Sequence, residues 1–362
     1  MSKFLKILFL PLFLLNLLVA VCLICCAYSP MLPAEQIPLL SLAGLAFPFV
    51  LAANALFLAL WLLVFPRYAV IPLVTCALCF VQIRAFFPIN FDNQSPSKDC
   101  IKVLSYNIFR PNINASNTNK KNAVISYLEE ADADIICLQE FCFSSLKKQN
   151  KLLAKYPYKS YLVSKDGEVA SHYLGCLSKY PIISVEKIPF EETFNGCGKY
   201  RILHDGDTIV VYNCHLQSNS LKGEDKSAYE QMLSNPRDNI RSKSTQNLVK
   251  KLCDAAVKRA GQVDIIAADI KKESSPYVIV CGDFNDSPIS YAYRRLEKHL
   301  DDAYIQSGNG PGISYNRNKL YYRIDHILHS SQFKAYKCTV DRTIKVSDHY
   351  PIYCFLEKIQ TN

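Results

Sequence analysis

Two long apolar segments near the N-terminus limit what this chain can fold into. Residues 4–28 and 39–65 are almost uninterrupted apolar runs. A helix of roughly 20 apolar residues crosses a hydrocarbon core of about 30 Å, so each run predicts a transmembrane helix. A third run, residues 69–83, is shorter. We therefore expect two or three spans within a membrane region of residues 1–90, followed by a separate domain of residues 91–362.

The first run also resembles the apolar part of a cleaved signal peptide, because Lys3 and Lys6 precede it. However, it is longer than a signal-peptide core, no small-residue cleavage site ends it, and a second span follows closely. We interpret it as a retained membrane anchor.

The basic residues around the spans predict an orientation. Lys3 and Lys6 precede the first span and Arg67 lies between the second and third, whereas the connection at residues 29–38 contains no Lys or Arg. Because basic residues favour the cytoplasmic side, Lys3, Lys6 and Arg67 place the N-terminus in the cytoplasm. Three spans then place everything after residue 90 on the opposite side of the membrane. We predict an integral protein of a cytoplasmic-type membrane whose large domain is extracytoplasmic. Arg84 opposes this orientation, as do ten cysteines beyond residue 95, since exported domains seldom carry unpaired thiols.

Several of these cysteines have apolar neighbours. They lie inside strand-like runs and are predicted to be buried thiols: Cys137, Cys214, Cys281 and Cys354.

The large domain alternates short apolar runs with amphipathic stretches. Strands are predicted at residues 102–109, 133–141, 175–188, 207–216, 277–285, 323–330 and 346–353. Apolar positions at helical spacing predict helices within residues 119–130 and 237–271. The pattern predicts a domain that mixes strands and helices.

Polar side chains stand at or near the end of these apolar runs. They are Asn107, Glu140, His215, Asp283, Asn285, Asp325, Asp348 and His349. Burying a lone carboxylate costs several kcal/mol unless it is paired, hydrogen-bonded or bound to a metal. A fold that places these strand ends side by side would collect the carboxylates, histidines and amides in one pocket.

Such a pocket could bind a divalent metal ion and transfer protons. Carboxylate ligands without cysteine favour Mg²⁺, or Mn²⁺, over zinc. One histidine can activate water while the other protonates a leaving oxygen. The amides of Asn107 and Asn285 can donate to phosphate without adding negative charge. The residues therefore predict metal-assisted phosphoester hydrolysis.

Each residue taken alone has a simpler explanation. Glu140 could be a solvated acid at a strand end, and Asn285 could belong to an ordinary turn. Their occurrence together favours a site. Four other histidines are assigned structural positions: His172, His204, His326 and His329.

Seven short motifs in a fixed order support this interpretation. They are SYN at 105–107, LQE at 138–140, LSKYPI at 177–182, NCHLQS at 213–218, GDFND at 282–286, RIDHIL at 323–328 and SDHYP at 347–351. In combination they resemble the deoxyribonuclease I-like endonuclease/exonuclease/phosphatase superfamily from about residue 100 to residue 356. The resemblance implies an α+β fold, a four-layer α/β/β/α sandwich, here preceded by two or three transmembrane helices.

The resemblance also implies a metal site. Glu140 would hold Mg²⁺ with help from Asn107, and Asp348 would lie beside the metal.

It further implies the catalytic roles. Asp283 and Asn285 would orient the nucleophilic water and the scissile phosphate. Asp325 would pair with His349, and His215 would be the second histidine, as in the branch with deoxyribonuclease I and the sphingomyelinases.

Two positions depart from the abasic-site repair branch of this superfamily. Phe109 replaces an acid that follows the first Asn, and His215 replaces a tyrosine. Both differences argue against a dedicated abasic-site enzyme. The longer signatures of the inositol phosphatases are also missing from the sequence.

The substrate is less defined. A net charge of +9 suits an anionic partner such as nucleic acid or a membrane surface, but it also suits a merely solvated basic face. We expect a membrane-anchored phosphodiesterase acting on nucleic acid. The alternative is a phosphodiesterase or phosphatase acting on phospholipid or sphingomyelin headgroups, and an inactive binding module is disfavoured. Beyond the substrate and the bilayer, we infer no obligate protein partner.

Overall fold

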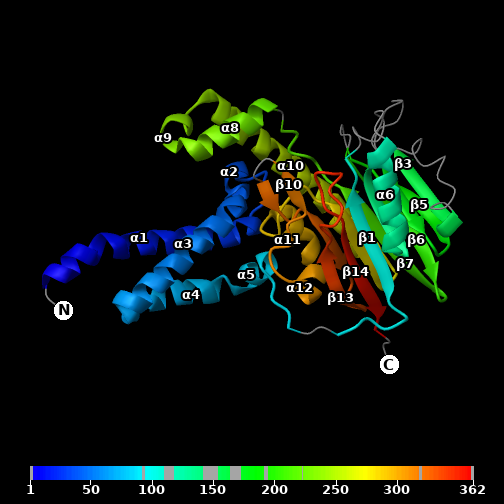
Figure 1. Cartoon of the computed structure of the whole chain (residues 1–362), viewed down its shortest axis with the longest axis horizontal. Helices are drawn as coiled ribbons and strands as arrows, with labels where there is room; N and C mark the ends of the chain where they lie inside the picture. The colour runs from blue at the N-terminus through cyan, green and yellow to red at the C-terminus, as the bar shows by residue number, and fades with distance from the viewer. Residues whose placement is uncertain are drawn as a thin grey trace.

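A bundle of N-terminal helices stands beside a sandwich of two β-sheets in the computed structural model of the chain (Figure 1). The structure describes residues 3–91, 94–109, 118–141, 154–163, 173–190, 195–221, 223–317 and 320–359. His172 lies outside these residues.

The helical bundle contains the predicted apolar runs. Its elements are α1 (Lys3–Tyr28), η1 (Ser29–Met31), α2 (Pro38–Ser41), α3 (Ala43–Val64), η2 (Pro66–Ala69), α4 (Val70–Leu78) and α5 (Phe80–Phe86). Two helices, over Phe9–Met31 and Ala43–Val64, are long and apolar enough to cross a membrane. The third run is bent by 67° between Pro66–Leu78 and Phe80–Phe86, so it is a broken span or a re-entrant segment.

The surface of the bundle is apolar and its few polar groups point inward. Leu56 is 72% exposed and Leu63 is 87% exposed. Inside the bundle, Trp61 Nε1 donates to Asn16 Oδ1 at 2.9 Å, and Asn54 Nδ2 donates to the Pro72 carbonyl at 3.2 Å. Helices that face lipid associate through such buried hydrogen bonds, because lipid offers polar groups no partner.

Two six-stranded sheets form the sandwich. The first has the order β13-β14-β1-β2-β4-β3, with bounds β13 (Phe333–Val340), β14 (Ile352–Lys358), β1 (Ile101–Asn107), β2 (Ile135–Phe141), β4 (Tyr173–Ser178) and β3 (Tyr158–Val163). The second has the order β5-β6-β7-β8-β12-β9, with bounds β5 (Ile182–Ile188), β6 (Gly196–His204), β7 (Asp207–His215), β8 (Tyr277–Asp283), β12 (Asp325–His329) and β9 (Asp301–Asp302). A separate hairpin pairs β10 (Tyr315–Arg317) with β11 (Leu320–Tyr322).

Helices cover the outer faces of both sheets: α6 (Thr118–Ala131) covers the first, and α10 (Lys243–Lys272) and α11 (Tyr291–Glu297) cover the second. Helices α8 (Gly223–Ser234) and α9 (Pro236–Asn239) lie beside α10, away from the sheets (Figure 1). Helix α12 (Ala303–Ser307) contributes Ala303 and Tyr304 to the core between the sheets. Leu128 of α6 packs against the first sheet, and Val263 and Ile266 of α10 pack against the second. A third apolar core, which includes Val103 and Ile279, lies between the sheets. The four-layer α/β/β/α sandwich expected from the resemblance is confirmed.

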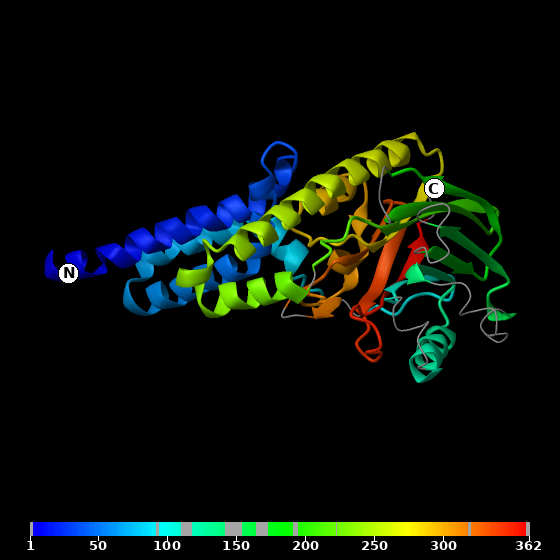
Figure 2. The ribbon, with the colours of Figure 1, turned by 90° about the horizontal axis from the view of Figure 1, so that it is seen from above.

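Helix α10 links the sandwich to the N-terminal bundle. Ser242 caps it by accepting a hydrogen bond from Thr245 N at 3.2 Å. Figure 2 shows α10 running over the sandwich and beyond it toward the bundle. Its Ala256 and Ala260 pack against Ala34, which lies between α1 and α3.

The structure corrects two predicted strands. Residues 175–188 form two strands in different sheets, because the chain crosses between the sheets at Lys179–Pro181 and proline cannot donate to a ladder. The strand predicted at residues 346–353 begins only at Ile352; residues 346–348 form bends, and His349 forms an isolated antiparallel bridge with Tyr315. The buried, free thiols predicted for four cysteines are confirmed: Cys137, Cys214, Cys281 and Cys354.

Candidate active site

The strand register brings the ends of several strands to one edge of the sandwich. Strands β7 and β8 are parallel and pair His215 with Asp283. Strand β12 runs antiparallel to β8 and pairs its first residue, Asp325, with the same Asp283. In the other sheet, parallel β1 and β2 pair Asn107 with Gln139, the residue before Glu140. Each sheet therefore delivers polar side chains to the same edge.

Asn107 connects the two sheets across this edge. Its Nδ2 donates to Asp283 Oδ2 at 2.9 Å and lies 3.3 Å from Glu140 Oε1. Glu140 has a left-handed φ of 49° and lies where the β2–β4 register shifts between Leu138 and Phe141. Such bulges redirect a side chain at the edge of a sheet. The local irregularity thus turns the Glu140 carboxylate toward the opposite sheet.

The two histidines face the same carboxylates. His349 Nδ1 lies 2.9 Å from Asp325 Oδ2, and His349 Nε2 lies 3.6 Å from Asp283 Oδ2. His215 Nε2 lies 3.7 Å from Glu140 Oε1 and 3.9 Å from Asp283 Oδ2. Both imidazoles are buried, so they meet the carboxylates in a region with little water.

The electrostatics of this cluster shift two pKa values. Burial raises the pKa of Asp283 to about 6, with a further rise from Asp325, while His349, His215 and Asn107 act in the opposite direction. Burial alone would lower the pKa of His349, but Asp325 and then Asp283 outweigh it and raise that pKa to about 10. At neutral pH the cluster therefore contains an ionised Asp283 beside a protonated His349.

Asn285 follows β8 in a left-handed conformation, with a φ of 52°. Its backbone N–H donates to Asp283 Oδ1 at 2.8 Å and its Nδ2 donates to the Leu216 carbonyl at 3.0 Å. One amide hydrogen is therefore used to connect the ends of β7 and β8.

Asp348 is half-buried and directly precedes His349. Its Oδ1 lies 3.5 Å from Ser347 Oγ, and its backbone carbonyl accepts a hydrogen bond from Asn316 N at 3.2 Å. The structure thus joins Asn107, Glu140, His215, Asp283, Asp325 and His349 by short contacts, with Asn285 bonded to Asp283 and Asp348 on the adjoining loop.

The donor set fits a hard divalent cation. Ligand atoms of Asp283, Asp325 and His349 lie within 4.8 Å of one another. Among the residues that the structure describes, Asp325 Oδ1 has no hydrogen-bond partner although it is buried, which is costly for a carboxylate unless a cation neutralises it. Glu140, whose side chain is 18% exposed, offers a further carboxylate on the more open side of the cluster.

Three residues that support the cluster were not assigned roles from the sequence. Gln139 Nε2 donates to Asn213 Oδ1 at 2.7 Å and so bridges the two sheets below the site. Ser347 Oγ donates to the Asn107 carbonyl at 2.8 Å and accepts from His349 N at 3.1 Å. All three lie inside the sequence motifs, within two residues of Glu140, His215 or His349. This proximity in the sequence could have identified them as residues that support the site.

A fourth supporting residue, Arg259, lies on α10 among apolar positions at helical spacing. Its Nε donates to Asp286 Oδ2 at 3.0 Å, and its Nη1 donates to the Gln217 carbonyl and to Asn219 Oδ1, both at 2.9 Å. It therefore ties the loop after β8 to the loop after β7.

Of the histidines assigned structural positions, the three that the structure describes, His204, His326 and His329, are buried. His326 Nε2 lies 3.1 Å from the Asp286 carbonyl and its ring packs against Phe284 and Tyr293. Burial lowers the pKa of His326 to about 4, so it is neutral.

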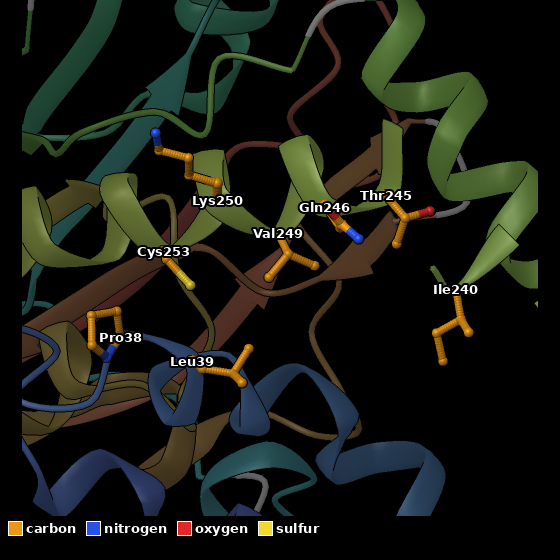
Figure 3. Close-up of a pocket in the computed structure, with 8 residues that line it drawn as sticks. All are labelled: Pro38, Leu39, Ile240, Thr245, Gln246, Val249, Lys250 and Cys253. Carbon is orange, nitrogen blue, oxygen red and sulfur yellow. The ribbon is translucent and has the colours of Figure 1, made fainter. Parts of the chain in front are cut away.

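A separate groove of about 500 Å³ lies between α2 and the N-terminal half of α10 (Figure 3). In this view Val249 points toward Leu39, whereas Lys250 points away. The described residues that line the groove are largely apolar, and none of them is a carboxylate or a histidine.

A family model described as the Endonuclease/Exonuclease/phosphatase family matches residues 104–349. The chain belongs to this family. A second model, a domain of unknown function (DUF8431), matches residues 5–86. The two matches divide the chain at the junction between the helical bundle and the sandwich. A search of curated proteins found no match.

Solved structures with the same fold include three that differ in source. D. rerio TDP2, complexed with a single-strand DNA product, has a TM-score of 0.52 at 16% identity, covering 72% of this chain and 100% of that chain. The human Nocturnin catalytic domain with bound sulfate has a TM-score of 0.51 at 15% identity, covering 73% and 96%. An endonuclease/exonuclease/phosphatase from Bacteroides vulgatus has a TM-score of 0.52 at 19% identity, covering 72% and 100%. At these identities the likeness concerns the fold.

Proposed function

We propose that the chain is a membrane-anchored, divalent-metal-dependent phosphodiesterase that acts on nucleic acid. The observation that carries the proposal is the convergence of Asn107, Glu140, His215, Asp283, Asp325 and His349 at one edge of the sandwich. Members of its family are phosphoester hydrolases, and this cluster supplies a proton acceptor, a proton donor and cation ligands. An inactive binding module would have no need to keep all of these groups in contact.

The metal would be held by Glu140 with Asn107, and Asp348 would lie beside it. Glu140 is favoured because its carboxylate is partly open, and Mg²⁺ usually keeps several waters. Asp283, Asp325 and His349 are more deeply buried, and His349 already lies 2.9 Å from Asp325 Oδ2 and 3.6 Å from Asp283 Oδ2. When bound, the cation would neutralise charge on the phosphate and polarise the phosphorus for attack.

The residues of the chain would then perform the proton transfers. Asp283 accepts the proton of the attacking water, since its carboxylate is ionised at neutral pH. Asn285 is fixed by its bonds to Asp283 and to the Leu216 carbonyl, and it would help to orient the scissile phosphate. His349, oriented by Asp325 through Nδ1, presents Nε2 to the phosphate oxygens.

His215 approaches the cluster from β7, beside Glu140. Its Nε2 would donate a proton to the leaving oxygen as the phosphorus–oxygen bond breaks. The attacking water thus loses one proton to Asp283, and the leaving oxygen gains one from His215. Asp283 and His215 then return to their starting protonation states by proton exchange with solvent.

Nucleic acid is favoured as the substrate on two grounds. The chain carries a net charge of +9, which suits a polyanion. TDP2, which has the same fold, is complexed with a single-strand DNA product. The second candidate is a phospholipid or sphingomyelin headgroup, favoured because a helix bundle suited to a bilayer packs directly against the sandwich.

The arrangement of the bundle supports a proposed membrane orientation. Phe9 packs against Phe65 and Phe13 against Tyr68, so the turn that contains Arg67 lies beside the N-terminal half of α1. The sandwich lies at the other end of the bundle (Figure 1). Because basic residues favour the cytoplasm, we propose that the sandwich is extracytoplasmic.

Substrate assays on the full chain in detergent would test the proposed function. Single-stranded DNA, RNA, sphingomyelin vesicles and bis-p-nitrophenyl phosphate would each be incubated with Mg²⁺ and with a chelator. We expect Mg²⁺-dependent cleavage of DNA or RNA that weakens as salt rises, because phosphate contacts release counterions. Cleavage of sphingomyelin alone would favour the lipid candidate, and hydrolysis that persists in chelator would contradict metal dependence.

A further inference from the structure

The loop that follows β8 reaches from the active site into the N-terminal bundle. Ile289, four residues after Asn285, is 1% exposed. It packs in an apolar cluster whose other members all come from the N-terminal helices, including Leu23, Phe47 and Cys79. The loop that carries a candidate catalytic amide is therefore seated among helices that could span the membrane.

Gly44, the second residue of α3, permits this close approach. A Cβ atom at this position would lie 1.8 Å from the Ile289 carbonyl oxygen and 3.0 Å from its carbonyl carbon. Both are backbone atoms, so a side chain at residue 44 could be accommodated only by moving the loop. The contact between α3 and the loop therefore requires a residue without a side chain at position 44.

A second loop, which leads into β12, also rests on the bundle. Tyr322 donates through its hydroxyl to the Leu45 carbonyl at 2.9 Å. Arg323 donates through Nη2 to the Ala85 carbonyl at 2.6 Å, and its guanidinium is fully buried against the Tyr304 ring. Ala85 lies in the last turn of α5, where helix carbonyls lack partners within the helix. Asp325 lies two residues after Arg323 in the chain, at the start of β12.

The two loops are joined to each other beside the catalytic groups. Phe284 N donates to the Ile324 carbonyl at 2.8 Å, and His326 Nε2 lies 3.1 Å from the Asp286 carbonyl. A shift of either loop would consequently move Asp283 relative to Asp325.

We propose that the N-terminal helices are a structural part of the catalytic centre, because they hold the loop that carries Asn285 and the loop that leads into Asp325 at the start of β12. Gly44 and Arg323 are positioning residues in this arrangement. A simple tether would contact the sandwich only through the segment that joins them, whereas here the contacts come from the first turn of α3 and the last turn of α5. The consequence for catalysis rests on the proposed function, but the anchoring of the loops does not.

The test compares two substitutions of glycine by alanine in the full chain, in detergent. Gly44→Ala places a methyl group against the Ile289 backbone. Gly261→Ala, in α10, is the matched control, because a Cβ there would meet no atom within 4 Å. Displacing catalytic groups by about 1 Å can cost about a hundredfold in rate. We expect kcat for bis-p-nitrophenyl phosphate to fall at least about tenfold in Gly44→Ala, with little change in KM, and to stay unchanged in Gly261→Ala.

Hydrogen exchange provides a measurement that does not depend on activity. In Gly44→Ala, amides of residues 284–290 and 322–325 should exchange faster than in the unaltered chain, while the strands between them keep their protection. Tyr322→Phe is a milder second variant that keeps the ring and removes only the hydrogen bond to Leu45. Losing one such bond should raise exchange in residues 322–325 about fivefold.

The two proposals can fail separately. If both loops keep their exchange rates in Gly44→Ala and Tyr322→Phe, the anchoring is overturned, whatever the activity. If the loops loosen in a folded Gly44→Ala protein but kcat is unchanged, the role in catalysis is overturned. Lack of hydrolysis by the unaltered chain would contradict the proposed function and leave the exchange result to decide the anchoring.

Discussion

Replacing His215 with alanine tests the assignment of the proton donor. His215 Nε2 lies 3.7 Å from Glu140 Oε1 and 3.9 Å from Asp283 Oδ2, and its side chain is only 6% exposed, so the imidazole is held close to both carboxylates. A positioned general acid contributes about 10²–10⁴-fold to the rate. At about 1.4 kcal/mol for each factor of ten, this is about 3–5 kcal/mol of transition-state stabilisation.

The size of the loss should depend on the leaving group. A nucleotide 3′- or 5′-oxygen is a poor leaving group and needs a proton as the bond breaks, so His215→Ala should lower its cleavage by about a hundredfold or more. A p-nitrophenolate leaves as a stable anion and needs little protonation, so bis-p-nitrophenyl phosphate should lose far less.

The assay is steady-state hydrolysis of both substrates by the full chain and the variant at several Mg²⁺ concentrations. His299→Ala, an exposed histidine at the end of α11, is the control and should leave both rates unchanged. An equal loss on the two substrates would refute the role of proton donor for His215.

Two further predictions concern the metal and the stability of the sandwich. Glu140→Gln should raise the Mg²⁺ concentration needed for half-maximal hydrolysis by about tenfold or more, because a ligand carboxylate is lost; an unchanged Mg²⁺ titration would exclude Glu140 as a ligand. Glu273 has a pKa of about 2: burial acts to raise it, but the Ser275 N–H, Arg201 and Lys199 outweigh this. Relative to about 4.3 for an unfolded glutamate, this shift stabilises the fold by about 3 kcal/mol at neutral pH, an effect present above pH 4.3 and lost as pH falls toward 2. Glu273→Gln should therefore unfold at a lower temperature than the unaltered chain at pH 7 and show a smaller difference near pH 3, whereas the exposed control Glu186→Gln should change little.

The candidate groups of the site could be named from the sequence because each lies at or near the end of an apolar run. Asp283 and His215 follow runs that pair in parallel, so their side chains necessarily reach the same edge. Periodicity predicted the strands, and the resemblance carried by the motifs implied the two-sheet sandwich.

Other features depend on contacts that leave no local pattern. The packing of Gly44 on Ile289 joins positions far apart in the chain, and the partner atom is a backbone carbonyl. The bond from Arg323 to Ala85 has the same character. Likewise, the crossing between sheets at Lys179–Pro181 depends on which neighbours the flanking strands find, so the run at 175–188 was predicted as one strand.

The central claim is that the clustered side chains form one hydrolytic centre in which Asp283 accepts the proton of water. Its most direct measurement is Mg²⁺-dependent hydrolysis of bis-p-nitrophenyl phosphate by the full chain and by Asp283→Asn, with folding checked by circular dichroism. We predict turnover by the unaltered chain and a loss of about a hundredfold or more in the variant. Equal turnover by a folded Asp283→Asn protein would contradict the account.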